Sequence, residues 1–244
     1  MRGIWLAKPI GTKPGALLPR DWIFRLRTTH AYKSLLWAVK RHVAPFLFAL
    51  IFLYLGIALA NHFIFTIADA FGVFCRPKAD SVDLMPDERR SSTFDTASLC
   101  AASGFKLEGN ERYRITVRKD PNSWHDGGIE TSTGGFHITE LPWWRQPLML
   151  AALPLKRTLI RPWFRVIARI GATGNDEEFL DPRVPPAADG MLQEVIRARH
   201  SGELFFYVND APLSIPGLTD YFYRDNRGTA EITVHRLPRP IAPE

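Results

Sequence analysis

The chain has 244 residues, enough for one domain of ordinary size with a shorter appendage. Its formal net charge of +6 would be a reason to consider nucleic acid as a partner. The distribution of charge argues against that class. Residues 1–42 carry nine Lys and Arg residues and one acidic residue, whereas the remaining chain has 22 basic and 24 acidic residues. We therefore expect no nucleic-acid partner. The excess of positive charge belongs to the N-terminal segment alone.

An apolar run follows the basic segment and explains it. From Val43 to Ala68 there is no Asp, Glu, Lys or Arg over 26 residues. A helix of that length measures about 39 Å at ~1.5 Å per residue, which exceeds the ~30 Å hydrocarbon core of a bilayer. A cleaved signal peptide is the competing interpretation, but its apolar region has only about 7 to 15 residues. We predict a basic juxtamembrane segment over residues 1–42 and one lipid-embedded transmembrane helix over residues 43–70.

The two cysteines both follow the predicted span. The positive-inside rule keeps residues 1–42 in the cytoplasm and exports the rest of the chain. Disulfides form and persist on that side, so we predict a bond between Cys75 and Cys100, worth about 3 kcal/mol through loop closure. Two unpaired thiols are the alternative. A zinc site is excluded here because zinc takes four ligands and no His cluster is nearby.

The exported part divides into a linker over residues 71–103 and a domain over residues 104–239. Residues 76–98 are polar and contain Pro77 and Pro86, so we expect them to follow the domain surface and contribute no core. The domain shows short apolar or alternating segments separated by Gly, Pro, Asn and Asp, at residues 112–117, 163–171, 202–208 and 228–237. This pattern predicts an all-β fold, a jelly roll or β-sandwich, preceded by one transmembrane α-helix.

One tryptophan-containing segment, residues 141–163, fits this scheme least well. Its prolines exclude a single continuous helix. The apolar side chains could form an outer-leaflet contact beside the span or pack in the sandwich core, and both interpretations stay open. The residues concerned are Trp143, Trp144, Leu148, Met149 and Leu150.

No common catalytic motif appears in the sequence, so we expect a protein without enzymatic activity. The G-x-S-x-G elbow, the Walker lysine motif, H-E-x-x-H and G-x-G-x-x-G are all absent. The acidic group Asp176–Glu178 is interpreted as an exposed loop.

Two polar clusters lie at the edges of predicted strands near the C-terminus. Asn209 and Asp210 end GELFFYVNDA, and Asp225 and Asn226 begin DNRG, which leads into TAEITV. These stretches resemble the C-terminal signature of the bacterial calcium-dependent galactose-binding lectins, a jelly-roll family related to the galactose-binding-like sandwiches. The resemblance extends over residues 104–236 and is specific in the last thirty of them.

The resemblance implies a ligand set for calcium and sugar. Asp210 matches the family aspartate that binds both, and Asp225 and Asn226 occupy the positions of two asparagine ligands. Thr219 is a candidate for the threonine ligand, so the implied metal ligands are Asp210, Asp225, Asn226 and Thr219. The implied ligand-binding set is Asn209, Asp210, Tyr223, Asp225 and Asn226, with Trp124 and Asp126 from a tryptophan-containing loop; Trp124 or Tyr221 would stack on a sugar ring.

The sequence also departs from the family. Fourteen residues separate Asp210 from Asp225, which is more than in the lectins, and the sugar-contacting His and Gln are not reproduced. Galactose itself is therefore not implied. The alternative is that both polar clusters make side-chain-to-backbone bonds in ordinary turns.

Three hypotheses about function follow. The first is a single-pass protein of the bacterial inner membrane, with a cytoplasmic N-terminus and a periplasmic module that binds a glycan or glycolipid, with calcium as an implied cofactor. The second is a non-catalytic accessory or structural subunit of a membrane protein complex. The third is an accessory subunit of a separate phospholipase-like hydrolase, because anchored lectin-like modules resemble the C-terminal parts of large bacterial proteins that begin with such a domain.

Overall fold

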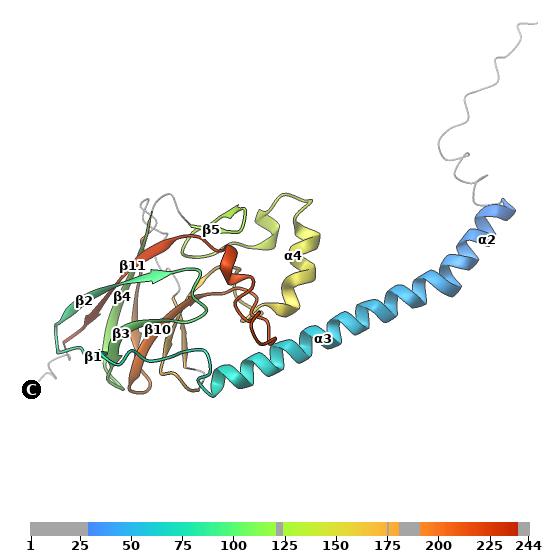
Figure 1. The fold of residues 1–244 in the computed structure, drawn as a ribbon. Coiled ribbons are helices and arrows are strands. Elements are labelled where there is room, and N and C mark those ends of the chain that lie inside the picture. The colour runs from blue at the N-terminus through green and yellow to red at the C-terminus, as the bar shows by residue number, and fades with distance from the viewer. Residues whose placement is uncertain (1–28, 121–123, 175, 181–190, 239–244) are drawn as a thin grey trace, which may run out of the picture. The chain divides into compact units, whose positions relative to one another are not determined.

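The computed structural model describes residues 29–120, 124–174, 176–180 and 191–238. One long apolar helix precedes a β-rich domain with sheets, as the sequence predicted (Figure 1). The basic residues before position 29 lie outside the described residues. Residues from Leu55 onward form one compact unit that contains the β-rich domain, and residues up to Tyr54 form another.

The helical part begins earlier than the predicted span. Helix α2 covers His30–Ala38, a π-helical segment η1 covers Val39–Val43, and helix α3 covers Ala44–Ala70. Thr29 caps α2, since its hydroxyl accepts a hydrogen bond from the Tyr32 amide at 3.3 Å. The stretch His30–Ala70 is long and apolar enough to cross a membrane.

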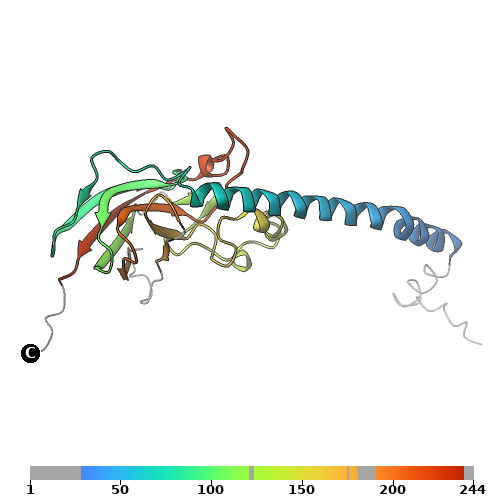
Figure 2. The ribbon, with the colours of Figure 1, turned by 90° about the horizontal axis from the view of Figure 1, so that it is seen from below.

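Two sheets form the β-rich domain (Figure 2). The five-stranded sheet has the order β1 (Val82–Asp83), β3 (Ala101–Leu107), β10 (Gly202–Val208), β7 (Val166–Ile170) and β8 (Glu177–Phe179). The four-stranded sheet has the order β2 (Arg89–Asp95), β11 (Thr229–Arg236), β4 (Arg112–Lys119) and β9 (Met191–Arg197). A small hairpin pairs β5 (His125–Asp126) with β6 (Ile129–Glu130). All strand pairs are antiparallel except β1 with β3.

A single hydrophobic core joins residues of both large sheets. In β4 and β11 every second residue is buried in it, as the alternation in the sequence predicts. Strand β10 is buried on both faces: Leu204 and Phe206 face the core, whereas Phe205 and Tyr207 lie on the opposite face. Burial on both faces explains why GELFFYV is an unbroken apolar run.

The expectation that residues 76–98 contribute no core was wrong. This segment contains β1 and β2, and β2 pairs with β11 along its whole length. Leu84 and Phe94 are buried in the main core. The polar sequence is explained by the position of β2 at the edge of its sheet, where most of its side chains are exposed. Phe94 is the one side chain of β2 that is buried in the core.

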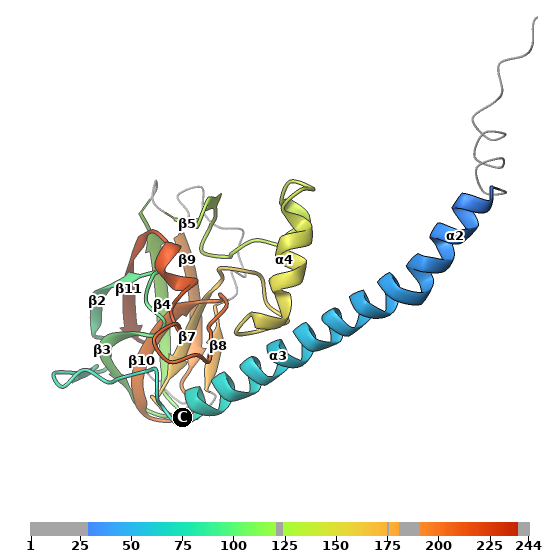
Figure 3. The same ribbon diagram turned by 45° about the vertical axis from the view of Figure 1, so that its right-hand side comes forward.

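Short helical segments complete the described fold outside the sheets. They are η2 (Ile138–Glu140), α4 (Gln146–Ala152), η3 (Leu153–Leu155) and η4 (Tyr223–Asp225). Pro147 lies in the first turn of α4, where its missing amide hydrogen costs little. Figure 3 shows α4 outside both sheets.

Candidate functional site

Three loops bring several predicted site residues together. Asp210 follows the end of β10, Asp225 ends η4, and Asp126 ends β5. The β5 backbone is held beside the segment after η4, since the amide of His125 donates to the carbonyl of Arg227 at 2.8 Å and the reverse bond measures 2.9 Å. This bridge places Asp126 near Asp225, although 99 positions separate them in the sequence.

The turn between β5 and β6 touches the Asp225 carboxylate. A Cβ atom added at Gly127 would lie 3.0 Å from Asp225 Oδ2, and Gly127 has φ +53°. Both facts favour glycine at this position, because a side chain would need an uncommon backbone conformation and would crowd the carboxylate. Asp225 therefore packs directly against the turn that carries Asp126.

Hydrogen bonds connect Asp210 with the η4 segment. The side-chain nitrogen Nδ2 of Asn226 donates to Asp210 Oδ2 at 2.9 Å and to the Thr96 carbonyl at 3.4 Å. The Ala211 amide donates to Asp210 Oδ1 at 2.7 Å. Tyr223 is fully buried and its hydroxyl donates to the Val208 carbonyl at 3.0 Å, which fixes η4 against the end of β10.

The three carboxyl groups lie within electrostatic reach of one another. Burial and, to a smaller extent, the charges of Asp210 and Asp225 together raise the pKa of Asp126 to about 8. The pKa of Asp210 is raised to about 6, because burial and the charge of Asp225 outweigh the opposing hydrogen bonds from Asn226 and Ala211. No basic side chain contributes to either shift. The cluster therefore brings three carboxyl groups together without a compensating cation in the described part of the chain, and this arrangement disfavours their charged forms.

One amide oxygen of the cluster has no hydrogen-bond donor. Asn226 Oδ1 is buried and unpartnered among the described residues, which is costly for a polar atom. Over the same residues, no group of three or more His, Cys, Asp or Glu side chains could hold a metal ion by itself. A cation at this place would need the Asn226 oxygen and main-chain carbonyls, or a movement of the exposed Asp225 side chain, in addition to Asp210.

Two predicted ligand-binding residues are used inside the fold. Trp124 is 1% exposed, its ring makes edge contacts with Phe94 and Phe164, and its indole nitrogen donates to the Thr229 carbonyl at 2.8 Å. It therefore offers no ring face to a sugar, in contrast to the expected stacking role. A tryptophan in a Gly- and Asp-rich loop looked accessible, but the loop inserts this side chain into the core.

Asn209 has a similar internal role. Its side-chain oxygen accepts from the Thr158 amide at 2.9 Å, and its nitrogen donates to the carbonyls of Thr158, Arg161 and Pro162. The side chain is fully buried and holds residues 158–162 beside the end of β10. Because the side chain of Asn209 is fully buried, it is not accessible to a ligand.

The loop between the two polar clusters keeps Thr219 apart. Its hydroxyl donates to the Ile215 carbonyl at 3.4 Å and its carbonyl accepts from the Leu213 amide, so the described contacts stay within the loop. Tyr221, in the same loop, is exposed and meets Phe222 edge to face. Tyr221 is therefore the accessible aromatic ring on this part of the chain.

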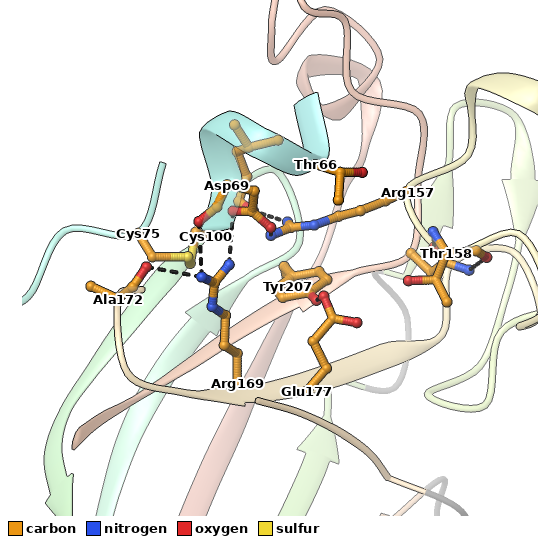
Figure 4. Close-up of polar contacts among 12 residues, drawn as sticks. Thr66, Asp69, Cys75, Cys100, Arg157, Thr158, Arg169, Ala172, Glu177 and Tyr207 are labelled. Carbon is orange, nitrogen blue, oxygen red and sulfur yellow. Dashed lines mark hydrogen bonds and ion pairs between the residues drawn. A yellow bond between two sulfur atoms is a disulfide. The ribbon is translucent and has the colours of Figure 1, made fainter. Parts of the chain in front are cut away.

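A second polar cluster, which sequence analysis did not find, lies at the end of α3. Asp69 is buried between two guanidinium groups: Arg157 contacts its Oδ2 at 2.8 Å and Arg169 contacts its Oδ1 at 2.8 Å (Figure 4). Arg169 also donates to the main-chain carbonyls of Asp69, Ala172 and Gly174. The end of the helix is thereby bound to the strand β7 and the turn that follows it.

Aromatic contacts extend this cluster to β10. The Arg157 guanidinium lies 3.4 Å from the centre of the Tyr207 ring and 5.2 Å from that of Phe65, and Tyr207 donates a hydrogen bond to Glu177. Glu177 and Glu178 belong to strand β8, and Asp176 is buried. The expectation that Asp176–Glu178 form an exposed loop was therefore wrong. The charges are matched within the cluster, which indicates a structural role.

Two further links join the helix end to the β-rich domain. Cys75 and Cys100 form a disulfide with a Cα–Cα distance of 5.2 Å. Asn61 in α3 donates to the Pro212 carbonyl at 3.0 Å and accepts from the Ser214 amide at 2.6 Å. Several turns of α3 after Leu55 are therefore part of the folded domain.

No protein-family model matches the chain. A search of curated proteins also found no match.

Proposed function

We propose that the protein is a membrane-anchored module that binds a glycan or glycolipid through a divalent cation site at Asp126, Asp210, Asp225 and Asn226. The observation that carries the proposal is the placement of Asp126, Asp210 and Asp225 around Asn226, whose side-chain nitrogen donates to Asp210 and whose buried side-chain oxygen has no partner among the described residues. Such a cluster is unfavourable by itself and favourable around a cation.

The donor set fits calcium best among common metals. All four side chains offer oxygen, which calcium takes in groups of six to eight, and the cluster contains no Cys or His of the kind that zinc prefers. Asp210 would hold the ion from β10, Asn226 and Asp225 from η4 and its cap, and Asp126 from β5. Bound calcium supplies free coordination positions for vicinal sugar hydroxyls.

The surrounding residues have positioning roles in this proposal. Tyr223 and the His125–Arg227 bridge hold the three loops in register. Asn209 fixes the chain immediately before Asp210. Tyr221 presents an exposed ring for the apolar face of a sugar. The sheets and these loops fit a β-sandwich of the galactose-binding-like type, which is the fold that we propose for the domain.

The cellular arrangement belongs to the same proposal. The helix His30–Ala70 is long and apolar enough to span a membrane, and the basic residues before it favour a cytoplasmic N-terminus. The β-rich domain would then lie in the periplasm of a bacterium, where glycans are accessible and the Cys75–Cys100 disulfide is stable.

Thermal unfolding of the full chain in mild detergent tests the cation site. With free calcium at 100 times its dissociation constant, we expect about 2.7 kcal/mol of stabilisation relative to a chelator. The variant D210N should lose this increment, whereas D83N, at an exposed position on β1, should retain it. Equal melting with calcium and with chelator would refute the cation site.

A glycan array probed with the detergent-solubilised chain tests the binding function. We expect calcium-dependent binding to one or more bacterial surface glycans, abolished by D210N and retained by D83N. Calcium-dependent stabilisation without any glycan signal would leave a structural cation site and reject the lectin function.

A further inference from the structure

A cluster of large apolar side chains is exposed around α4, and no described residue covers it. Trp143 is 81% exposed, Leu148 is 71% exposed and Ile160 is 86% exposed. We call this cluster the α4 face, defined by Trp143, Trp144, Leu148, Leu150, Leu159 and Ile160. Isolated exposed apolar residues are ordinary, but a group of this size marks a contact surface.

The segment that carries the α4 face packs against the main core. Met149 and Ala152 of α4 and Leu155 of η3 pack against the main core, so both segments are held to the domain while Leu148 and Leu150 stay exposed. The start of α4 is tied to the β5–β6 turn, because Arg145 donates to the Gly128 carbonyl at 3.0 Å and lies 4.7 Å from the centre of the Trp144 ring. The exposed side chains are therefore not on a loose segment.

Exposed charge is nearly absent from this part of the chain. Between Leu141 and Ile160 the charged residues are Arg145, Lys156 and Arg157, and the last two are buried. A surface for a polar protein partner would carry more charge at its rim, whereas tryptophan and leucine beside a single arginine are typical of the interfacial zone of a bilayer.

Two contacts connect the surroundings of the α4 face with the apolar helix. Arg157, two residues after η3, pairs with Asp69 near the end of α3. Asn61 of α3 holds the loop that starts at Pro212, and this loop exposes two more apolar residues, Ile215 and Leu218. Asn61 lies about 20 residues after Lys40 and Arg41, which is the length of one span. In the proposed anchoring, the loop that Asn61 holds would therefore follow the end of the span.

We infer that the α4 face docks onto the outer leaflet of the same bilayer that α3 spans, with Trp143, Trp144, Leu148, Leu150 and Ile160 inserted among the lipids. This inference rests on the proposed membrane anchoring and adds a second, peripheral contact to it. Because Arg145 links α4 to the turn that carries Asp126, docking also brings the cation site close to the lipid headgroups.

Tryptophan fluorescence of the full chain in lipid nanodiscs tests the docking. The nanodiscs contain phosphatidylcholine, either unmodified or brominated near the headgroup end of the acyl chains. Subtracting the emission of W143F/W144F from that of the unmodified protein isolates the two α4 tryptophans from the other five. We expect brominated lipid to remove most of this difference emission. Equal difference emission in both lipids overturns the inference.

Two variants test whether quenching is specific to the α4 face. In the background W143F/W144F, V195W places a tryptophan at an exposed position of β9. Its emission, obtained by subtracting that of W143F/W144F, should be the same in both lipids. L148D/L150D changes two exposed residues and should protect Trp143 and Trp144 from quenching while the chain stays in the nanodisc. Unchanged quenching in L148D/L150D contradicts docking through this face.

The test separates docking from anchoring. A chain that does not co-purify with nanodiscs, or that an alkaline carbonate wash releases from membranes, refutes the anchor. An anchored chain whose α4 tryptophans are unquenched refutes only the docking, and cross-linking of the α4 face to a second copy or to another protein under those conditions would identify the occupant that replaces lipid.

Discussion

The domain contains two acidic clusters, one buried and one only partly buried, that differ in how their charge is balanced. At the end of α3, Asp69 lies between the guanidinium groups of Arg157 and Arg169, and both of its oxygens are paired. At the ends of β5, β10 and η4, Asp126, Asp210 and Asp225 approach one another without a basic partner in the described chain. The first cluster is complete and holds the fold together, whereas the second lacks positive charge.

The largest expected effect is at the balanced cluster. D69N leaves two buried guanidinium groups facing a neutral amide, and breaking a buried pair in this way costs about 3–5 kcal/mol. Chemical unfolding of the detergent-solubilised chain should show this loss, and D80N, at an exposed position, should show none. A loss below about 1 kcal/mol in D69N would mean that the pair contributes no more than a surface ion pair.

Removing the disulfide should have the next largest effect. C75S/C100S releases the chain between the helix end and β3, and the expected cost is about 3 kcal/mol for a loop of this length. Unfolding under non-reducing conditions, compared with the unmodified protein after reduction, measures it. If both give the stability of the oxidised protein, then the ion pairs of Asp69 hold the helix end without the disulfide.

The unbalanced cluster should make stability depend on pH in the opposite sense to an ordinary ion pair. Asp126 and Asp210 have folded pKa values of about 8 and about 6, raised above their unfolded values. Their contribution is therefore fully present below about pH 4 and is lost as the pH rises through 6 and 8. In chelator, D126N/D210N should gain stability relative to the unmodified protein between pH 5 and 8.

With calcium bound, stability should instead increase as the pH rises. Because binding requires the carboxylate forms, calcium affinity should increase from pH 6 to pH 8 with release of protons. Isothermal titration calorimetry in buffers of different ionisation enthalpy would measure the protons released. A calcium affinity that is independent of pH over this range would contradict ligation by Asp126 and Asp210.

The smallest effect is expected at the exposed member of the cluster. D225N keeps an oxygen ligand and removes one charge, so we expect about a tenfold weaker calcium affinity, equivalent to ~1.4 kcal/mol. The fold should be unaffected because Asp225 is exposed. If D225N binds calcium as tightly as the unmodified protein, then Asp225 belongs to the electrostatic surroundings and is not a ligand.

Local patterns were sufficient to predict strands β4, β7, β10 and β11, whereas β2, β3, β8 and β9 were not predicted. The alternation in β4 and β11 and the apolar run of β10 each identified a strand, because burial of one face or of both is visible in a few consecutive residues. Strand β2 was missed since its one large buried residue, Phe94, gives no periodic signal. Its position depends on pairing with β11, more than a hundred residues later in the chain.

The site was partly predictable for a similar reason. Asp210, Asp225 and Asn226 follow from a short recognisable stretch, but the convergence of Asp126 with them depends on the bridge between His125 and Arg227. The roles of Trp124 and Asn209 could not be predicted, because only the folded chain shows that Phe94 and Phe164 enclose the indole and that the Thr158 loop uses the amide. Asp69 gave one signal in the sequence, because it is the first charged residue after 26 positions without Asp, Glu, Lys or Arg.

Asn61 and Asp69 attach α3 to the β-rich domain. This attachment limits how far the domain can move from the helix. A binding domain on a flexible tether searches a volume that grows with the length of its linker. Here the helix continues into the folded domain without such a linker after Leu55. The turns of α3 after Leu55 therefore belong to the same compact unit as the sheets, and no flexible tether separates Asn61 and Asp69 from the β-rich domain.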